Sequence, residues 1–216
     1  YEKVHNQTIA DVKTLLGAGE EWQMLFMGGG AATQFALLPT NLLPAGSFAQ
    51  YVLTGHWAEA ALAEARKLGD VRELWTSGPT HQHVPTSGEV VPDPKAAYVH
   101  WTSNNTIYGT ELANDDVLSG GPAIVCDMSS DILSRPVNLA PYSLIYAGAQ
   151  KNLGPAGVTV VLIRKELLER CRKDVASIWS YPKIAAANSL QNTPPCFAIY
   201  LVGLVGAWPD KTHLAP

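Results

Sequence analysis

The chain has 216 residues, with 15 Lys and Arg against 19 Asp and Glu and a formal net charge of −4. This length favours one large domain, and the negative net charge argues against a nucleic-acid binder, which usually carries a basic excess on one face. Hydrophobic residues make up 47% and charged residues 16%, below the roughly 25% charged residues of an average soluble domain. These proportions exclude a disordered chain and indicate that much of the surface is hidden in a core or against a partner.

The cysteines and the first residues bear on the cellular compartment. Cys126, Cys171 and Cys196 form no CxxC motif, and an odd number of cysteines cannot pair completely. This favours a reduced, intracellular compartment, with the cysteines as buried apolar residues. We expect no signal peptide, because the first six residues hold no apolar stretch, and no membrane span, because no run of about 18 apolar residues occurs. The expected location is the cytoplasm.

Two hydrophobic periods alternate along the chain and predict helices and strands in turn. Helical spacing predicts helices at 4–16, from 31 onward with a kink or early end at Pro39, and at 58–68, 165–173 and 195–206. Short apolar runs predict buried strands at 22–27, 50–54, 71–75, 97–101, 123–126, 144–147 and 158–163. A stretch rich in Pro, Gly and Ser, 77–95, predicts a long surface loop. This alternation predicts an α/β fold with a mostly parallel central sheet flanked by helices.

Polar or small residues follow five of the predicted strands. In a parallel sheet, ligands bind beyond the carboxyl ends of the strands, so these residues are the candidates for a binding site. They are Gly28–Ala32, Gly55–Trp57, Thr102–Thr106, Asp127 and Ala149–Lys151.

Together these residues supply what pyridoxal phosphate requires. Its aldehyde needs a Lys amine for a Schiff base, which Lys151 offers, and its pyridine nitrogen needs a carboxylate, which Asp127 offers. Trp57 offers an aromatic face for the ring, and the helix N-terminus after the turn at 28–32 offers backbone N–H groups for the phosphate. Thr106 is placed to donate a hydrogen bond to the phenolic oxygen or to the carboxylate partner.

Each feature taken alone has a structural alternative. The Gly-rich turn lacks the third Gly of a dinucleotide fingerprint and the Lys of a phosphate loop, and Trp57 alone favours packing. Asp127 alone is typical of a cap, and Lys151 of a solvated charge. Their common placement at strand ends favours the cofactor site. A nucleotide-binding, dehydrogenase-like domain remains the alternative that rests on the Gly-rich turn.

Four histidines are expected to lie outside this site. His81 and His83 have the i, i+2 spacing of a metal-binding pair, but no carboxylate or third His clusters with them in the sequence. A solvated loop is therefore favoured, and no metal is expected. His56 and His100 are interpreted as structural. A supporting, hydrogen-bonding role is expected for Ser129 and Ser130.

Longer stretches resemble the phosphoserine aminotransferase family of class V pyridoxal-phosphate enzymes. They are Gly28–Phe35, Pro39–Leu43, Thr54–Trp57, Asn104–Glu111, Asp127–Ser134, Tyr146–Gly157 and Asn192–Pro195. The resemblance extends from Tyr1 to about Trp208, and the run Gln150–Gly157 distinguishes this family from the cysteine desulfurases and other class V relatives.

The resemblance implies a role for each matched residue. Lys151 would be the catalytic residue, which bonds to the cofactor and carries the proton between the substrate α-carbon and the cofactor. Asp127 would pair with the pyridine nitrogen, Trp57 would stack on the ring, and Thr106 would bind near the phenolic oxygen. The cofactor phosphate would be bound by the backbone N–H groups of Ala31 and Ala32, by the Gln150 side chain, and by Asn192 and Thr193 of the partner in a homodimer.

The resemblance also implies a reaction. It is amino transfer between L-glutamate and 3-phosphohydroxypyruvate, giving O-phospho-L-serine and 2-oxoglutarate, in serine biosynthesis. Members of the family are longer, with an N-terminal arm and a small C-terminal domain that hold the substrate. We therefore expect 1–208 to be the cofactor-binding large domain, incomplete at its N-terminus and without the small domain, and 209–216 to be an atypical tail. A truncated fold that binds the cofactor without catalysis, or another class V enzyme, are the alternatives.

Overall fold

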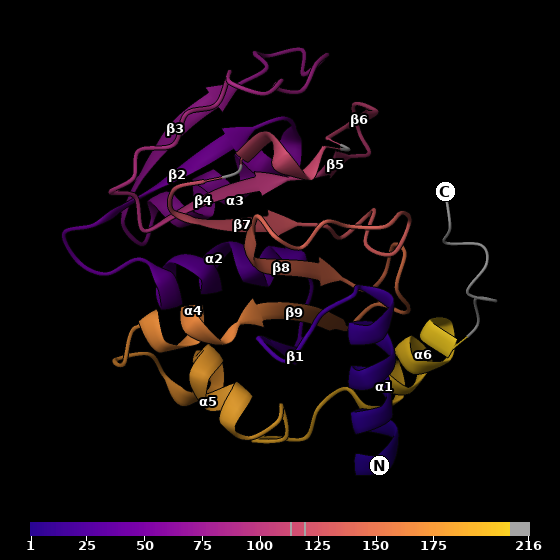
Figure 1. Ribbon diagram of the computed structural model, residues 1–216. Coiled ribbons are helices and arrows are strands. Elements are labelled where there is room, and N and C mark those ends of the chain that lie inside the picture. The colour runs from indigo at the N-terminus through magenta and orange to yellow at the C-terminus, as the bar shows by residue number, and fades with distance from the viewer. Residues whose placement is uncertain (113, 119, 208–216) are drawn as a thin grey trace.

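A seven-stranded sheet forms the centre of the computed structural model, which describes residues 1–112, 114–118 and 120–207. The strand order is β1-β9-β8-β7-β4-β2-β3 (Figure 1). All seven predicted strands are present, with ends within two residues of those expected. The tail expected at 209–216 lies outside the described residues. The strands are β1 (Trp22–Gly28), β2 (Phe48–Leu53), β3 (Asp70–Thr76), β4 (Tyr98–Thr102), β7 (Ala123–Asp127), β8 (Tyr142–Gly148) and β9 (Val158–Arg164).

The sheet is mostly parallel, as predicted, with β9 as the exception. Strand β9 pairs antiparallel with both β1 and β8, whereas β3, β2, β4, β7 and β8 run parallel. Parallel neighbours need a long crossover connection, whereas antiparallel neighbours can be joined by a short one. The nine residues 149–157 between β8 and β9 contain no helix, so the chain turns back beside itself. This short connection carries Gln150 and Lys151.

The helices correspond to the predicted ones, with one addition. They are α1 (Glu2–Leu15), α2 (Ala31–Leu42), α3 (His56–Arg66), α4 (Lys165–Arg170), α5 (Tyr181–Ala186) and α6 (Cys196–Ala207), with short 3-10 turns η1 (Asp115–Leu118) and η2 (Ser177–Trp179). Helix α5 was not expected from the sequence, because six residues are too few to show a helical period. A two-residue hairpin, β5 (Asn104–Asn105) with β6 (Thr110–Glu111), also escapes sequence patterns.

Two predicted helix ends are wrong. Helix α2 does not stop at Pro39 but continues to Leu42. The ring removes only one N–H donor, and buried leucines on both sides of it keep this helix on the sheet. Helix α4 ends at Arg170, because Cys171 has extended backbone angles.

Helices cover both faces of the sheet, which confirms the predicted α/β class. Alternate residues of β1 show the two faces: Trp22, Met24 and Phe26 pack in the core with α1 and α6, whereas Leu25 and Met27 pack in the core with α2, α3, α4 and α5. Helices α1 and α6 lie side by side (Figure 1). Two apolar layers of this kind fix which edge of each strand is available for a site.

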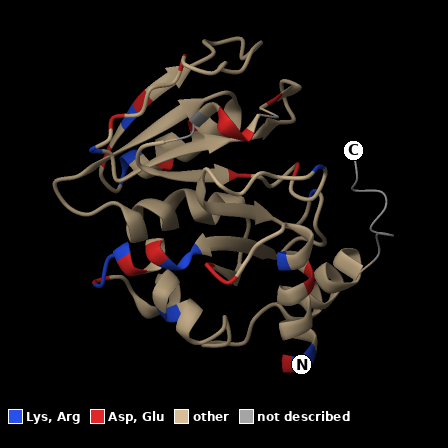
Figure 2. Cartoon of the chain, viewed as in Figure 1, with Lys and Arg blue, Asp and Glu red and all other residues tan. Residues whose placement is uncertain are grey.

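The low share of charged residues is concentrated in particular elements. Helices α2 and α6 carry no charged side chain (Figure 2). In the described part of the chain, no helix is long and apolar enough to cross a membrane. Cys126 and Cys171 are buried, as expected, but Cys196 is half-buried at the start of α6, where the helix faces solvent on one side.

Candidate active site

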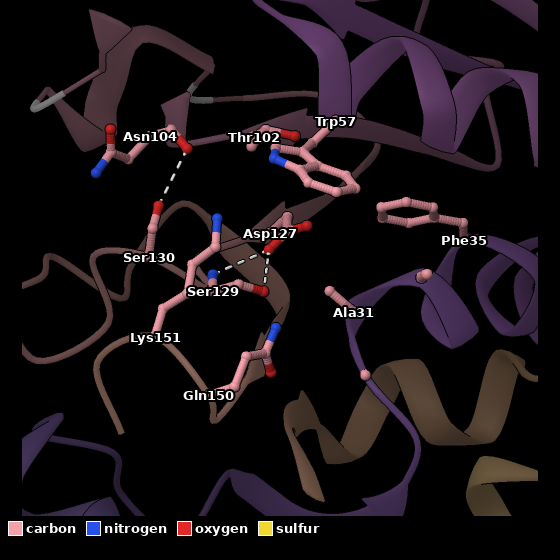
Figure 3. A pocket seen from close by; sticks show the side chains of 12 residues that line it. Ala31, Phe35, Trp57, Thr102, Asn104, Asp127, Ser129, Ser130, Gln150 and Lys151 are labelled. Atoms are coloured by element: carbon pink, nitrogen blue, oxygen red, sulfur yellow. Dashed lines mark hydrogen bonds between the residues drawn. The ribbon is translucent and has the colours of Figure 1, made fainter. Parts of the chain in front are cut away.

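A cavity of about 160 Å³ opens at the carboxyl ends of β4, β7 and β8, against the first turns of α2 and α3. Its lining residues come from five separate segments of the chain, which the sheet topology brings together (Figure 3). They are Gly30, Ala31, Ala32, Phe35, Trp57, Thr102, Asn104, Asp127, Ser129, Ser130, Gln150 and Lys151. Six of the predicted site residues are therefore in one place.

Asp127, the last residue of β7, forms the floor of this cavity. Its Oδ1 atom accepts two hydrogen bonds from Ser129, at 2.9 Å from the backbone N–H and at 2.6 Å from the hydroxyl. The side chain is 4% exposed, and this burial raises the pKa of the carboxyl, while the hydrogen bonds from Ser129 oppose the rise. A cationic partner in the cavity would favour the carboxylate form.

Ser129 links this carboxylate to the neighbouring strand. Its hydroxyl oxygen also accepts the backbone N–H of Gly148 at 3.0 Å, at the end of β8 and three residues before Lys151. Ser130 contacts the other side, where its hydroxyl donates to the Asn104 carbonyl at 3.1 Å. The two serines thus join the β7 end to segments on both sides, in the supporting arrangement that was expected.

Lys151 lies in the turn after β8 and points toward Trp57 and Thr106. Its Nζ atom is 5.6 Å from the centroid of the Trp57 ring and 3.4 Å from Thr106 Oγ1. Thr106 does not line the cavity itself but contacts the lysine from the β5–β6 hairpin. The turn is anchored next to Lys151, because the Asn152 side-chain amide donates to the Ile132 carbonyl at 2.6 Å.

The N-terminus of α2 forms the remaining wall. Gly30 is the N-cap residue, and no side chain caps this helix or places an acid in its first turn. The first N–H groups of a helix have no partner within the helix, so those of Ala31 and Ala32 are available to an anion. Gly29 has a φ of 94°, and a Cβ at Gly148 would lie 3.1 Å from the Ala31 nitrogen. Small residues thus keep the backbone at this wall accessible.

The residues of the cavity fit a flat, dipolar ligand with an anionic group. Trp57 Nε1 and Thr102 Oγ1 are buried and have no hydrogen-bond partner within the described residues. Asp127 and Lys151 are the ionisable side chains among the residues that line the cavity. Asp127 suits a cationic ring nitrogen, and the α2 N-terminus suits a phosphate. Pyridoxal phosphate carries both groups on one aromatic ring.

Phe35 and Thr102 also line the cavity, although no sequence pattern singles them out. Phe35 lies at helical spacing, which is typical of a core residue, and Thr102 ends a buried strand. Asn192 and Thr193, expected to reach the partner's cofactor, lie at a different place in this chain. They are exposed and line a second cavity, of about 230 Å³, with Gly28 of β1.

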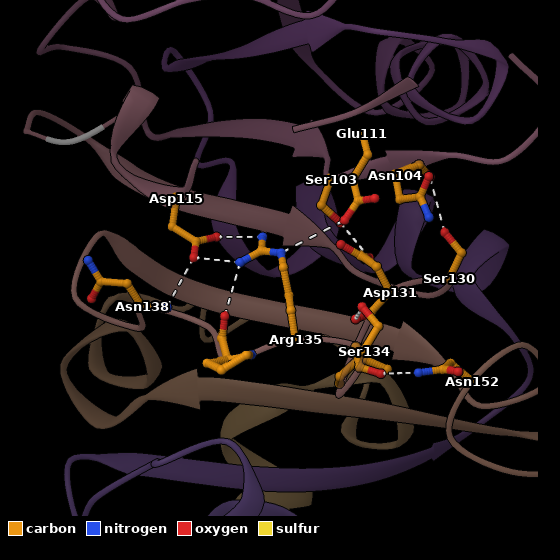
Figure 4. Close-up of polar contacts among 12 residues, drawn as sticks. Ser103, Asn104, Glu111, Asp115, Ser130, Asp131, Ser134, Arg135, Asn138 and Asn152 are labelled. Atoms are coloured by element: carbon orange, nitrogen blue, oxygen red, sulfur yellow. Dashed lines mark hydrogen bonds and ion pairs between the residues drawn. The ribbon is translucent and has the colours of Figure 1, made fainter. Parts of the chain in front are cut away.

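A buried polar network lies behind the β7 end (Figure 4). Ser103 donates to Asp131 at 2.6 Å, and Arg135 binds Asp115 with two hydrogen bonds of 2.9 and 3.0 Å. Arg135 also lies 3.8 Å from Glu111 in β6. Burial raises the pKa of Asp131 to about 6. Sequence reasoning missed this network, because its members are scattered and only Ser103 and Asp131 follow a strand end within a few residues.

His100 has the structural role that was expected. It is fully buried, its Nε2 atom lies 2.9 Å from the Tyr146 hydroxyl, and its ring stacks on Tyr51. Burial lowers the pKa of this imidazole to about 3, so it is neutral at physiological pH and acts as a packed hydrogen-bonding group.

Comparison with known proteins identifies the family. The Aminotransferase class-V family model matches residues 1–215. The chain belongs to the class-V aminotransferase family. The resemblance that the motifs indicated is thereby confirmed at the level of the family.

Several class-V relatives are named phosphoserine aminotransferase. One from Desulfatibacillum aliphaticivorans is 49% identical over 212 residues, which cover 98% of this chain and 58% of that relative. The solved phosphoserine aminotransferase of Bacillus circulans subsp. alkalophilus has a TM-score of 0.91 at 44% identity, over 96% of this chain and 58% of that one. The pyridoxal-phosphate-bound phosphoserine aminotransferase of Trichomonas vaginalis has a TM-score of 0.88 at 31% identity, over 96% and 62%. The chain thus spans about three-fifths of the length of these class-V relatives.

Proposed function

We propose that this chain binds pyridoxal phosphate and is the cofactor-binding part of an aminotransferase. The reaction is transfer of the amino group between L-glutamate and 3-phosphohydroxypyruvate, giving O-phospho-L-serine and 2-oxoglutarate, as a step of serine biosynthesis. The observation that carries the proposal is the convergence of Lys151, Asp127, Trp57 and the α2 N-terminus on one cavity. The names of the relatives support the choice of substrates.

The cofactor, when bound, supplies an aldehyde that condenses with amines and a ring that withdraws electrons from the substrate α-carbon. The chain supplies the remaining functions. Lys151 offers the amine, and when free it holds and moves a proton at Nζ. Asp127 faces the ring nitrogen and stabilises its positive charge, and Trp57 covers one face of the ring and excludes water from it.

The phosphate is held by backbone and amide donors. The N–H groups of Ala31 and Ala32 bind it at the positive end of the α2 dipole, and the Gln150 side chain adds a further donor. Thr106, 3.4 Å from Lys151 Nζ, holds the lysine toward the cavity and is placed near the phenolic oxygen.

We further propose a homodimer in which Asn192 and Thr193 of one copy reach the cofactor phosphate of the other. Their exposure in this chain supports the proposal, since both side chains are free to contact a second copy. The proposed location is the cytoplasm, and the proposed cofactor-binding domain is 1–208. Cofactor binding without turnover is a second candidate, which the coverage of about three-fifths of the relatives favours, because substrate-holding residues outside the matched region would be missing.

Chemical trapping tests the proposal. The chain is mixed with pyridoxal phosphate, reduced with borohydride, digested and mapped by mass spectrometry. We expect a pyridoxyl adduct on Lys151, its loss in Lys151→Ala, and its persistence in Lys165→Ala, a lysine at the start of α4. An adduct spread over surface lysines, with none favouring Lys151, would refute cofactor binding at this site. Assay of glutamate-dependent turnover then separates the two candidate functions.

A further inference from the structure

His81 is buried, in contrast to the solvated loop that the sequence favours. Its side chain is 2% exposed and its backbone has a φ of 46°, in the left-handed region that few residues other than Gly adopt. The neighbouring His83 is exposed and packs its ring edge against Trp75. No group of three metal-binding side chains occurs in the part of the chain that the structure describes, so these histidines do not form a metal site.

Both ring nitrogens of His81 have partners from other elements. Nδ1 lies 2.8 Å from the hydroxyl of Ser77, just after β3, and Nε2 lies 3.2 Å from a carboxylate oxygen of Glu59 in α3. A serine, a histidine and an acid can form a nucleophilic site, but Ser77 is 7% exposed and sits against the Leu53 carbonyl at 3.4 Å. It lines none of the cavities in the described residues. The three side chains therefore form a tie between elements rather than a catalytic centre.

The tie reaches the two segments that flank Lys151. Glu59 lies in the first turn of α3, two residues after Trp57. The ring of Tyr108 lies 4.7 Å from the His81 ring, centroid to centroid, and Tyr108 is two residues after Thr106. Trp57 and Thr106 are the residues that Lys151 Nζ approaches from these segments. A single buried imidazole thus contacts the supports of both.

We propose that His81 is a positioning residue of the cofactor cavity. Through Glu59 it fixes the first turn of α3 and therefore the indole of Trp57, and through Tyr108 it fixes the hairpin that carries Thr106. Holding both before the ligand arrives reduces the ordering cost of binding. The inference rests on the proposed function, since it assigns His81 to the site that binds pyridoxal phosphate.

Hydrogen–deuterium exchange of the cofactor-free chain tests the tie directly. In His81→Ala we expect faster exchange in peptides that cover 56–62 and 104–111, and unchanged exchange in peptides that cover β7, β8 and β9. His83→Ala, which changes the neighbouring exposed histidine, should leave all of these peptides as in the unaltered chain. Equal exchange in His81→Ala and His83→Ala would overturn the proposal, and so would a uniform increase along the whole chain, which indicates general destabilisation.

Titration with pyridoxal phosphate, followed by absorption, tests the consequence for the site. We expect the dissociation constant of His81→Ala to rise about tenfold, as loss of about one hydrogen bond's worth of preorganisation predicts. His81→Asn keeps a group that reaches Ser77 and tolerates the positive φ, so it should fold normally and still bind weakly, because it cannot reach Glu59. Glu59→Gln, which keeps an acceptor for Nε2–H, should bind more tightly than Glu59→Ala.

The outcomes separate this inference from the proposed function. If the unaltered chain fails to bind pyridoxal phosphate, the proposed function fails, while the exchange experiment still reports on the tie. If the unaltered chain binds and His81→Asn binds equally well, the positioning role fails and the proposed function stands.

Discussion

The hydroxyl of Ser129 lies 2.6 Å from the carboxylate of Asp127, and the backbone N–H of the same serine binds the same oxygen at 2.9 Å. Two donors therefore converge on one carboxylate oxygen in a buried place. They partly offset the burial that raises the pKa of Asp127. They also leave its other oxygen for a ligand, and the strength of this arrangement can be tested.

Ser129→Ala should weaken the binding of pyridoxal phosphate. It removes the hydroxyl donor, so the pKa of Asp127 rises further and the carboxylate becomes a poorer partner for the ring nitrogen. Hydrogen bonds to charged groups contribute about 1.5–3 kcal/mol, and we expect an increase of about tenfold or more in the dissociation constant. Absorption titration at neutral pH measures it. Ser130→Ala, whose hydroxyl binds the Asn104 carbonyl instead, is the matched control, and equal effects in both variants would contradict the role of Ser129.

Gly29→Ala should damage the phosphate wall. Gly29 has a φ of 94°, and an added Cβ would collide with the Thr33 hydroxyl in the first turn of α2. Gly46→Ala is the control, because Gly46 has a φ of 80° but open space around its Cβ position. Both variants should lose about 1–2 kcal/mol of stability from backbone strain.

The ligand distinguishes the two glycines. Gly29→Ala should lose affinity for pyridoxal phosphate and little affinity for pyridoxal, which has no phosphate, whereas Gly46→Ala should retain both. Calorimetric titration with each ligand measures the difference. A parallel loss for both ligands in Gly29→Ala would show that the turn shapes the cavity without binding the phosphate.

The strands and most helices could be predicted because they are periodic and long enough to show their period. The gathering of Lys151, Asp127 and Trp57 could be predicted as well, since residues at the carboxyl ends of parallel strands meet at one edge. His81 could not, because its burial depends on Ser77, Glu59 and Tyr108, which approach it only after the sheet has formed. The pair Asp115 and Arg135 escaped for the same reason, because twenty residues without a shared pattern separate them.

Asn192 and Thr193 should link cofactor affinity to protein concentration. If a second copy provides them, the dissociation constant of the unaltered chain for pyridoxal phosphate falls as dimer accumulates. The double substitution Asn192→Ala with Thr193→Ala should remove most of this dependence. Titrations at several protein concentrations, with sedimentation velocity at each, measure both quantities. Gln191→Ala, whose side chain binds the Ser177 carbonyl within the chain, is the control, and a concentration-independent affinity in the unaltered chain would exclude a shared site.

Asp131 should make stability fall as pH rises through its titration. Burial raises its pKa from 3.8 to about 6, with Glu111 and Asp127 adding to the rise and Ser103 and Arg135 opposing it. Because the folded-state pKa lies above the unfolded one, the contribution to stability is complete below pH 3.8 and is lost as pH passes about 6. Asp131→Asn keeps an oxygen that accepts from Ser103 but does not titrate.

Urea unfolding across this pH window measures the effect. A shift of this size corresponds to roughly 3 kcal/mol, so between about pH 3.5 and pH 7.5 the unaltered chain should lose about that much stability relative to Asp131→Asn. Asp115→Asn provides the opposite sign. Burial raises the pKa of Asp115, but the bonds from Arg135 and Tyr142 outweigh it and the net shift is downward, so this variant should be weaker than the unaltered chain at neutral pH. A difference between the unaltered chain and Asp131→Asn that stays constant with pH would show that Asp131 keeps an ordinary carboxyl pKa, which would place water or a cation beside it.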